Sequence, residues 1–140
     1  MTVDELLVEA RSMLTPRLNA LCAYAEMQQG ARLVDIRYRE QRARDGEIPG
    51  ALVVSRNEFE WRCDPGGLWR DPKISENDFS QRIIVLCNQG FQSSLAAANL
   101  VRIGLLNVTD VEGGMEAWLS SGLPVIPLAP AVRQKATDAF

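Results

Sequence analysis

Cys87 is the residue whose type and position are best suited to chemistry. It ends the apolar run RIIVLC at residues 82–87 and is followed by NQGFQSS. Gly90 lets this short loop turn its backbone N–H groups toward one point, because glycine adopts conformations that are closed to other residues. A helix expected from Ser93 adds the positive end of its dipole, and Ser93 and Ser94 could cap that helix or donate to the sulfur. The pattern predicts an electropositive cup around a reactive thiolate, with an ordinary buried cysteine at a strand end as the alternative.

The other residue types narrow the chemistry. The chain has no histidine, which excludes Ser-His-Asp and Cys-His catalysis and histidine-ligated metals. Its three cysteines, Cys22, Cys63 and Cys87, include no C-x-x-C pair, so we expect reduced thiols, no metal and no cofactor. Cys22 is expected on the buried face of a helix. Cys63 is a candidate resolving thiol for Cys87, with a structural role as the alternative.

Helical signals open the chain. Thr2 and Glu5 have the spacing of a capping box, which predicts a short helix over the first residues. The Thr-Pro pair at residues 15 and 16 predicts the start of a second helix, with Cys22 on its buried stripe and Gly30 at its end.

Buried strands and helices alternate in the rest of the chain. The expected strands are the apolar runs 31–36, 50–55, 82–87 and 107–111, and the expected helices are 93–103 and 115–120. This alternation predicts an α/β fold with a mainly parallel sheet. Cys87 then lies at the carboxyl end of a parallel strand, where such sheets bind ligands. Residues 59–80 lack a sustained period and are expected to form a long surface excursion.

Three ordered motifs resemble the single-domain rhodanese-like family of sulfurtransferases. They are LVDIRYREQRARDGEIPGALVV, the loop CNQGFQSS, and VTDVEGGMEAWLSSGLPV. The resemblance implies a central, mainly parallel five-stranded sheet flanked by helices. On this basis we expect an N-terminal helical extension at residues 1–14, a rhodanese-like domain at 15–128 and a flexible C-terminal tail at 129–140.

The resemblance also implies roles for particular residues. Cys87 would be the nucleophile that becomes a persulfide, taking sulfur from thiosulfate or a persulfide and passing it to cyanide, a thiol or a protein acceptor. Asp35 and Arg37 are expected to support the site, with Asp35 accepting hydrogen bonds from groups that brace the loop. The cup around the sulfur is expected from the backbone amides of Asn88, Gln89, Gly90, Phe91, Gln92 and Ser93.

Two departures leave other functions open. Many single-domain rhodaneses carry an arginine where this chain has Gln92, so Arg37 or Arg62 is expected to supply the missing cation for an anionic donor. Cysteine-dependent phosphatases need an arginine six residues after the cysteine, and this chain has Ser93 there. A non-catalytic regulatory or sulfur-carrier module that binds a protein partner is the second alternative.

Composition excludes some partners. The 140 residues are 46% hydrophobic and carry a net charge of -3, which fits one soluble domain without attraction to nucleic acid or an anionic membrane. The first residues carry acids where a signal peptide has bases, and no apolar run has the length of a membrane span. A cytoplasmic protein is therefore expected.

Overall fold

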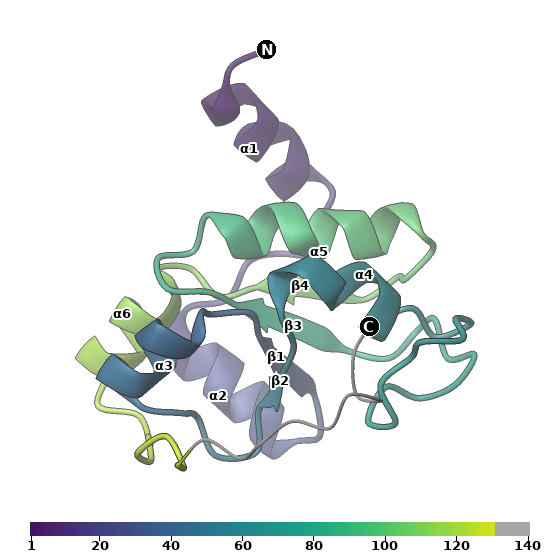
Figure 1. The fold of residues 1–140 in the computed structure, drawn as a ribbon. Coiled ribbons are helices and arrows are strands. Elements are labelled where there is room, and N and C mark those ends of the chain that lie inside the picture. Colours follow the sequence, from purple (N-terminus) through teal and green to yellow (C-terminus); the bar gives the residue numbers. More distant parts are fainter. Residues whose placement is uncertain (131–140) are drawn as a thin grey trace.

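The computed structural model describes residues 1–130, which form an alternating α/β chain (Figure 1). The predicted flexibility of the tail falls largely on residues 131–140, which lie outside the described part. In chain order the elements are α1 (Val3–Ser12), α2 (Ala20–Gln28), β1 (Arg32–Asp35), α3 (Arg39–Asp45), β2 (Leu52–Val53), the 3-10 turn η1 (Arg56–Glu58), α4 (Phe59–Arg62), β3 (Ile83–Leu86), α5 (Gln92–Arg102), β4 (Val108–Asp110) and α6 (Gly114–Ser120). No helix within residues 1–130 combines the length and the apolar character needed to cross a lipid bilayer.

The sheet has four parallel strands in the described residues, in the order β2-β1-β3-β4. The expected fifth strand is absent from this part of the chain, and a single parallel bridge between Leu18 and Val111 takes its place beside β4. The pairing stops there because the side chain of Asn19 caps a helix that begins one residue later, at Ala20.

Each face of the sheet is covered by its own helices. Ile83 and Val85 of β3 pack in a core with residues of α4 and α5, whereas Ile84 and Leu86 pack with residues of α2 and α6. This alternation is what the two-residue period of a strand produces when both faces are buried. Figure 1 shows α5 and α2 on opposite sides of the sheet, with α1 against the outer side of α5.

The N-terminal helix is confirmed, but the start of the second helix was predicted wrongly. Thr2 and Glu5 form the expected reciprocal capping box. The N–H groups of Thr15 and Leu18 donate to carbonyls of β4, so residues 15–18 run alongside that strand instead of coiling. The buried residues of this helix are Ala20 and Ala23, and Cys22 is exposed, contrary to the prediction.

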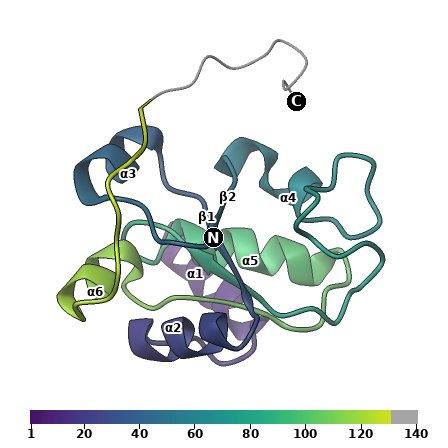
Figure 2. The same cartoon turned by 90° about the horizontal axis from the view of Figure 1, so that it is seen from below.

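The long excursion is fixed to the body by a few apolar side chains. Phe59 and Ile74 are fully buried in the core under α5, and Phe79 packs against the same core. Figure 2 shows this segment looping out beyond α4 before the chain returns to the sheet. The excursion therefore has a defined path on the α5 side of the sheet.

Candidate active site

The carboxyl ends of three neighbouring strands meet at one edge of the sheet and carry the polar residues of the site. Asp35 is in register with Leu86, and Asp110 is in register with Val85. Cys87 directly follows β3 and is therefore flanked by the last residues of β1 and β4. This is the edge at which open parallel sheets bind their ligands.

Two backbone N–H groups point at the sulfur of Cys87. The N–H of Gly90 donates to Sγ at 3.2 Å and the N–H of Ser93 donates at 3.3 Å. Ser93 is in the first turn of α5, where backbone N–H groups have no partner within the helix. Donors of this kind, at the positive end of a helix dipole, favour a negative sulfur.

Gly90 is required by the geometry of this loop. Its φ is +87°, and a Cβ built there would lie 2.8 Å from the backbone nitrogen of Gly113. Only glycine adopts this conformation without strain, and only glycine leaves room for the turn before α6.

The loop residues divide between the back and the mouth of a cleft. Gly90 and Ser93 hold the sulfur, whereas Asn88, Gln89, Phe91 and Gln92 line the cleft together with Cys87. The cleft has a volume of about 330 Å³ and is also lined by Ile36, Arg37, Tyr38, Gln41, Arg56 and Asn57. Cys87 is 7% exposed and Phe91 is 58% exposed, so a nearly buried cysteine lies beside an exposed aromatic side chain.

Asp35 and Arg37 form a buried ion pair beside the cleft. The guanidinium and the backbone N–H of Arg37 donate to the Asp35 carboxylate, with Nη2 2.8 Å from Oδ2. Arg37 also donates to the carbonyl of Gly46. These bonds hold the segment after β1 against the cleft, and Asp35 makes them with Arg37 instead of with groups that brace the Cys87 loop.

The cation nearest to Gln92 comes from η1. The Nε of Arg56 donates to Oε1 of Gln92 at 3.1 Å, and Nη1 donates to the carboxylate of Glu60. Arg62 is not among the residues that line the cleft and donates to Glu58 and to the carbonyl of Trp69. Arg56 was missed in the sequence, although it directly follows an expected strand whose carboxyl end meets this edge.

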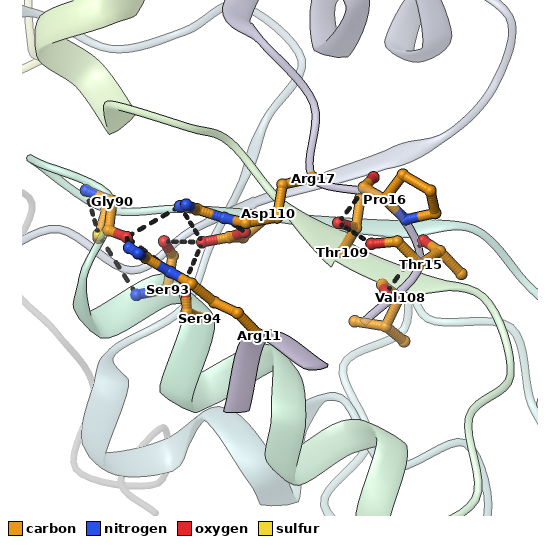
Figure 3. Close-up of polar contacts among 11 residues, drawn as sticks. Arg11, Thr15, Pro16, Arg17, Gly90, Ser93, Ser94, Val108, Thr109 and Asp110 are labelled. Carbon is orange, nitrogen blue, oxygen red and sulfur yellow. Dashed lines mark hydrogen bonds and ion pairs between the residues drawn. The ribbon is translucent and has the colours of Figure 1, made fainter. Parts of the chain in front are cut away.

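A closed ring of hydrogen bonds lies behind the loop, as Figure 3 shows. The Asp110 carboxylate is fully buried and accepts two bonds from Arg17 and one from each hydroxyl of Ser93 and Ser94. Arg11 donates to the Ser94 hydroxyl at 3.0 Å. Arg11 and Arg17 both donate to the carbonyl of Gly90, at 2.8 and 3.0 Å.

This ring corrects one expectation about the serines. Their hydroxyls donate to Asp110, and what Ser93 gives to the sulfur is its backbone N–H. Asp110 is the carboxylate that braces the loop, the role expected of Asp35. Its place at the end of an expected strand was a usable signal, but Arg11 and Arg17 are 79 and 73 residues from Gly90 in the chain and carry no local signal.

Cys63 lies in the apolar core. It is fully buried, and burial, followed by the charges of Asp71 and Glu60, raises the pKa of its thiol to about 12. A thiol held protonated in this way is a poor nucleophile, which argues against a resolving role for Cys63.

A protein-family model and curated proteins match parts of this chain. The family model of the rhodanese-like domain matches residues 20–121. The thiosulfate sulfurtransferase GlpE of Vibrio cholerae is 38% identical over 52 residues, which are 37% of this chain and 49% of that protein. The chain thus spans about half the length of the curated relatives it matches.

Solved structures extend the similarity to most of the chain. A Rhodopseudomonas palustris protein of unknown function, described as a possible tyrosine phosphatase, is 31% identical, with a TM-score of 0.79 over 90% of this chain and 95% of that one. A rhodanese-related protein of Thermoplasma volcanium is 27% identical, with a TM-score of 0.61 over 80% of this chain and 98% of that one. The polysulfide-sulfur transferase homodimer of Wolinella succinogenes shares the fold, at 23% identity and a TM-score of 0.70 over 89% of this chain and 87% of that one.

Proposed function

Because this chain belongs to the rhodanese-like domain family, we propose that it is a sulfurtransferase whose Cys87 carries sulfane sulfur as a persulfide. The observation that carries the proposal is the pair of backbone N–H groups, from Gly90 and Ser93, that donate to the Cys87 sulfur beside an open cleft. They stabilise the thiolate, which is the attacking form in sulfur exchange.

The reaction runs in two balanced displacements. The Cys87 thiolate attacks the outer sulfur of thiosulfate, a Cys87 S–S bond forms, and the donor's S–S bond breaks with its electron pair leaving on sulfite. An acceptor thiolate or cyanide then attacks the outer persulfide sulfur, and the electron pair of the breaking bond returns to Cys87. With an organic persulfide as donor, a thiolate leaves in place of sulfite. No step needs a histidine, which the chain lacks.

The groups around the cleft suit this cycle. The backbone N–H groups of Gly90 and Ser93 at the sulfur favour negative charge on Cys87. Arg37 and Arg56 line the cleft, and each forms an ion pair with a carboxylate. The cleft therefore offers N–H donors to an anion, but the positive charge of these donors is already largely balanced. This arrangement favours a monoanionic persulfide donor over the dianion thiosulfate.

A phosphatase reaction is disfavoured at this site. The position six residues after Cys87 is Ser93, whose hydroxyl is bound to the buried Asp110. No guanidinium from the loop is therefore available to hold phosphoryl oxygens.

The three unpaired cysteines suit a reducing compartment, for which we propose the cytoplasm.

The test is the mass of the intact protein after exposure to a donor. The reduced protein is incubated with thiosulfate or with an organic persulfide, freed of donor and weighed. We expect a gain of one sulfur atom in the wild type and in Cys22→Ser, and no gain in Cys87→Ser. Cys22→Ser is the matched control because Cys22 is an exposed thiol.

The wild-type adduct is then mixed with a thiol or with cyanide. Loss of the extra sulfur, with formation of an acceptor persulfide or thiocyanate, supports a transferase. A stable adduct that neither acceptor removes would contradict catalysis and favour a sulfur-carrier module. Absence of any adduct would overturn the proposal and leave a binding module, for which the exposed Phe91 at the cleft is the natural contact.

A further inference from the structure

The peptide between Gly90 and Phe91 is held from behind by two positive charges. Arg11 comes from α1 and Arg17 from the segment that runs beside β4, and their guanidinium groups meet at the Gly90 carbonyl (Figure 3). A carbonyl oxygen with two guanidinium donors is strongly fixed in direction, since hydrogen bonds to charged donors are about twice as strong as neutral ones.

Fixing this carbonyl also fixes the N–H of Phe91. In a trans peptide the N–H points opposite to the carbonyl, so the Phe91 N–H faces away from the two guanidinium groups. Two cations on the carbonyl oxygen draw electron density from the same peptide unit and make its N–H a better donor. The hydrogen bonds to the Gly90 carbonyl also fix the carboxyl side of Gly90, and the N–H of this same residue donates to the Cys87 sulfur.

We propose that Arg11 and Arg17 are positioning residues for Cys87, which hold the Gly90 carbonyl turned back so that the loop amides stabilise negative charge at the sulfur. The proposal rests on the reactive cysteine of the proposed function, but it requires only a thiolate and no sulfur transfer. Asp110 and Ser94 complete the arrangement because they hold the two guanidinium groups in place.

The groups around Arg11 act on its charge in opposite directions. Burial and the neighbouring Arg17 lower the pKa of Arg11, whereas Asp110, Glu112 and an anionic Cys87 favour its charged form. Arg11 also donates to the Ser94 hydroxyl, which donates to the buried Asp110, so its guanidinium is held beside the Gly90 carbonyl.

These positioning residues lie outside the part of the chain that matches the family model. The match covers residues 20–121, whereas Arg11 and Arg17 precede it. The helix α1 packs on α5 and places Arg11 beside the loop that precedes α5.

The test compares Arg11→Gln and Arg11→Lys with Arg102→Gln, and each variant is treated with iodoacetamide at neutral pH. Arg102 is the matched control because it joins α5 to Glu9 of α1 through an exposed ion pair. Site-resolved mass spectrometry follows alkylation of Cys87, and the exposed Cys22 serves as the reference thiol in the same molecule. The amide proton signals of Gly90 and Phe91 are followed in parallel by NMR.

We expect Arg11→Gln to slow alkylation of Cys87 by about fivefold, the loss of part of one charge-assisted hydrogen bond. The Cys22 rate should not change. Arg11→Lys should restore most of the rate and of the two amide signals, because an ammonium group keeps the charge near Gly90. Arg102→Gln should react like the wild type.

Two outcomes would overturn the proposal: an unchanged Cys87 rate in Arg11→Gln, or an equal loss in Arg11→Gln and Arg102→Gln. The second would mean that α1 merely supports the fold. Arg17→Gln is a second test of the same effect if that variant folds. If Arg17→Gln does not fold, the comparison of Arg11→Lys with Arg11→Gln decides whether the charge near Gly90 sets the Cys87 rate. A wild type that alkylates as expected but never gains sulfur would reject the proposed function while leaving this inference intact.

Discussion

Arg56 brings a guanidinium group to Gln92 of the loop. It reaches the cleft from η1, binds Gln92, and lies with its guanidinium carbon 6.0 Å from the centre of the Phe59 ring. Its ion pair with Glu60 leaves the side chain partly exposed. Arg56 therefore offers N–H donors to an anion at the cleft, although its charge is shared with a carboxylate.

Replacing Arg56 should change the preference between donors. We expect Arg56→Gln to raise the KM for thiosulfate by about threefold to tenfold, as for the loss of one hydrogen bond to a charged group, with kcat little changed. The effect on an organic persulfide should be smaller, because less negative charge has to be held. Steady-state kinetics with both donors measures the split.

Arg62→Gln is the matched comparison for this prediction. Arg62 also forms a four-residue-spaced pair with a glutamate, Glu58, but it does not line the cleft. If Arg62→Gln raised the KM for thiosulfate and Arg56→Gln did not, the cation for the donor would be Arg62, one of the two arginines, with Arg37, that the sequence suggested.

The loop and the helices show where sequence signals succeed and fail. The capping box predicted α1, and the helical pattern at residues 93–103 predicted α5, because both signals are local. The Thr-Pro signal for α2 failed because the chain there pairs with β4 instead. The ring at Asp110 joins residues 16 to 93 positions apart, and no local pattern predicts such contacts.

The turn at Gly90 is the part of the loop most sensitive to substitution. We expect Gly90→Ala to lower the free energy of unfolding by about 3 kcal/mol, since the new Cβ meets backbone that has to shift. It should also slow alkylation of Cys87, because the Gly90 N–H moves from the sulfur.

Gly30→Ala isolates the cost of the backbone conformation alone. Gly30 has φ +106°, and a Cβ there would have nothing within 4 Å. We expect a loss of about 1 kcal/mol by chemical denaturation and an unchanged Cys87 rate. Equal losses in the two variants would show that close packing behind the loop contributes nothing.

The whole molecule contains three thiols in three environments. Cys22 is exposed, Cys87 lies beside the cleft, and Cys63 is sealed in the core between the sheet and α5. The sequence placed Cys87 at a ligand-binding edge because the order of strands and helices determines where strand ends meet. It could not rank the burial of Cys22 and Cys63, which depends on how a helix turns and where a loop folds back.

The burial of Cys63 predicts a loss of stability in alkaline solution. Its thiol has an ordinary pKa of 9.0, which folding raises to about 12. The unfolded chain therefore releases this proton at a lower pH than the folded protein does. The stabilisation is complete below pH 9.0 and is lost as the pH rises from there toward the folded pKa of about 12. We expect the wild type to lose up to about 1.4 kcal/mol per pH unit more than Cys63→Ala in this range.

Denaturation curves across that pH range provide the measurement. Cys22→Ala is the control, because it removes an exposed thiol and should keep the slope of the wild type. The same slope in Cys63→Ala and the wild type would mean that Cys63 ionises as readily in the folded protein as in the unfolded chain.

The small exposed fraction of Cys87 has a consequence for the order of events. A residue that is 7% exposed does not have the room to touch two visiting molecules together. Under the proposed chemistry, the leaving group of the donor therefore has to dissociate before the acceptor binds. The transferred sulfur stays on the protein between these two binding events, so the two half-reactions occur one after the other.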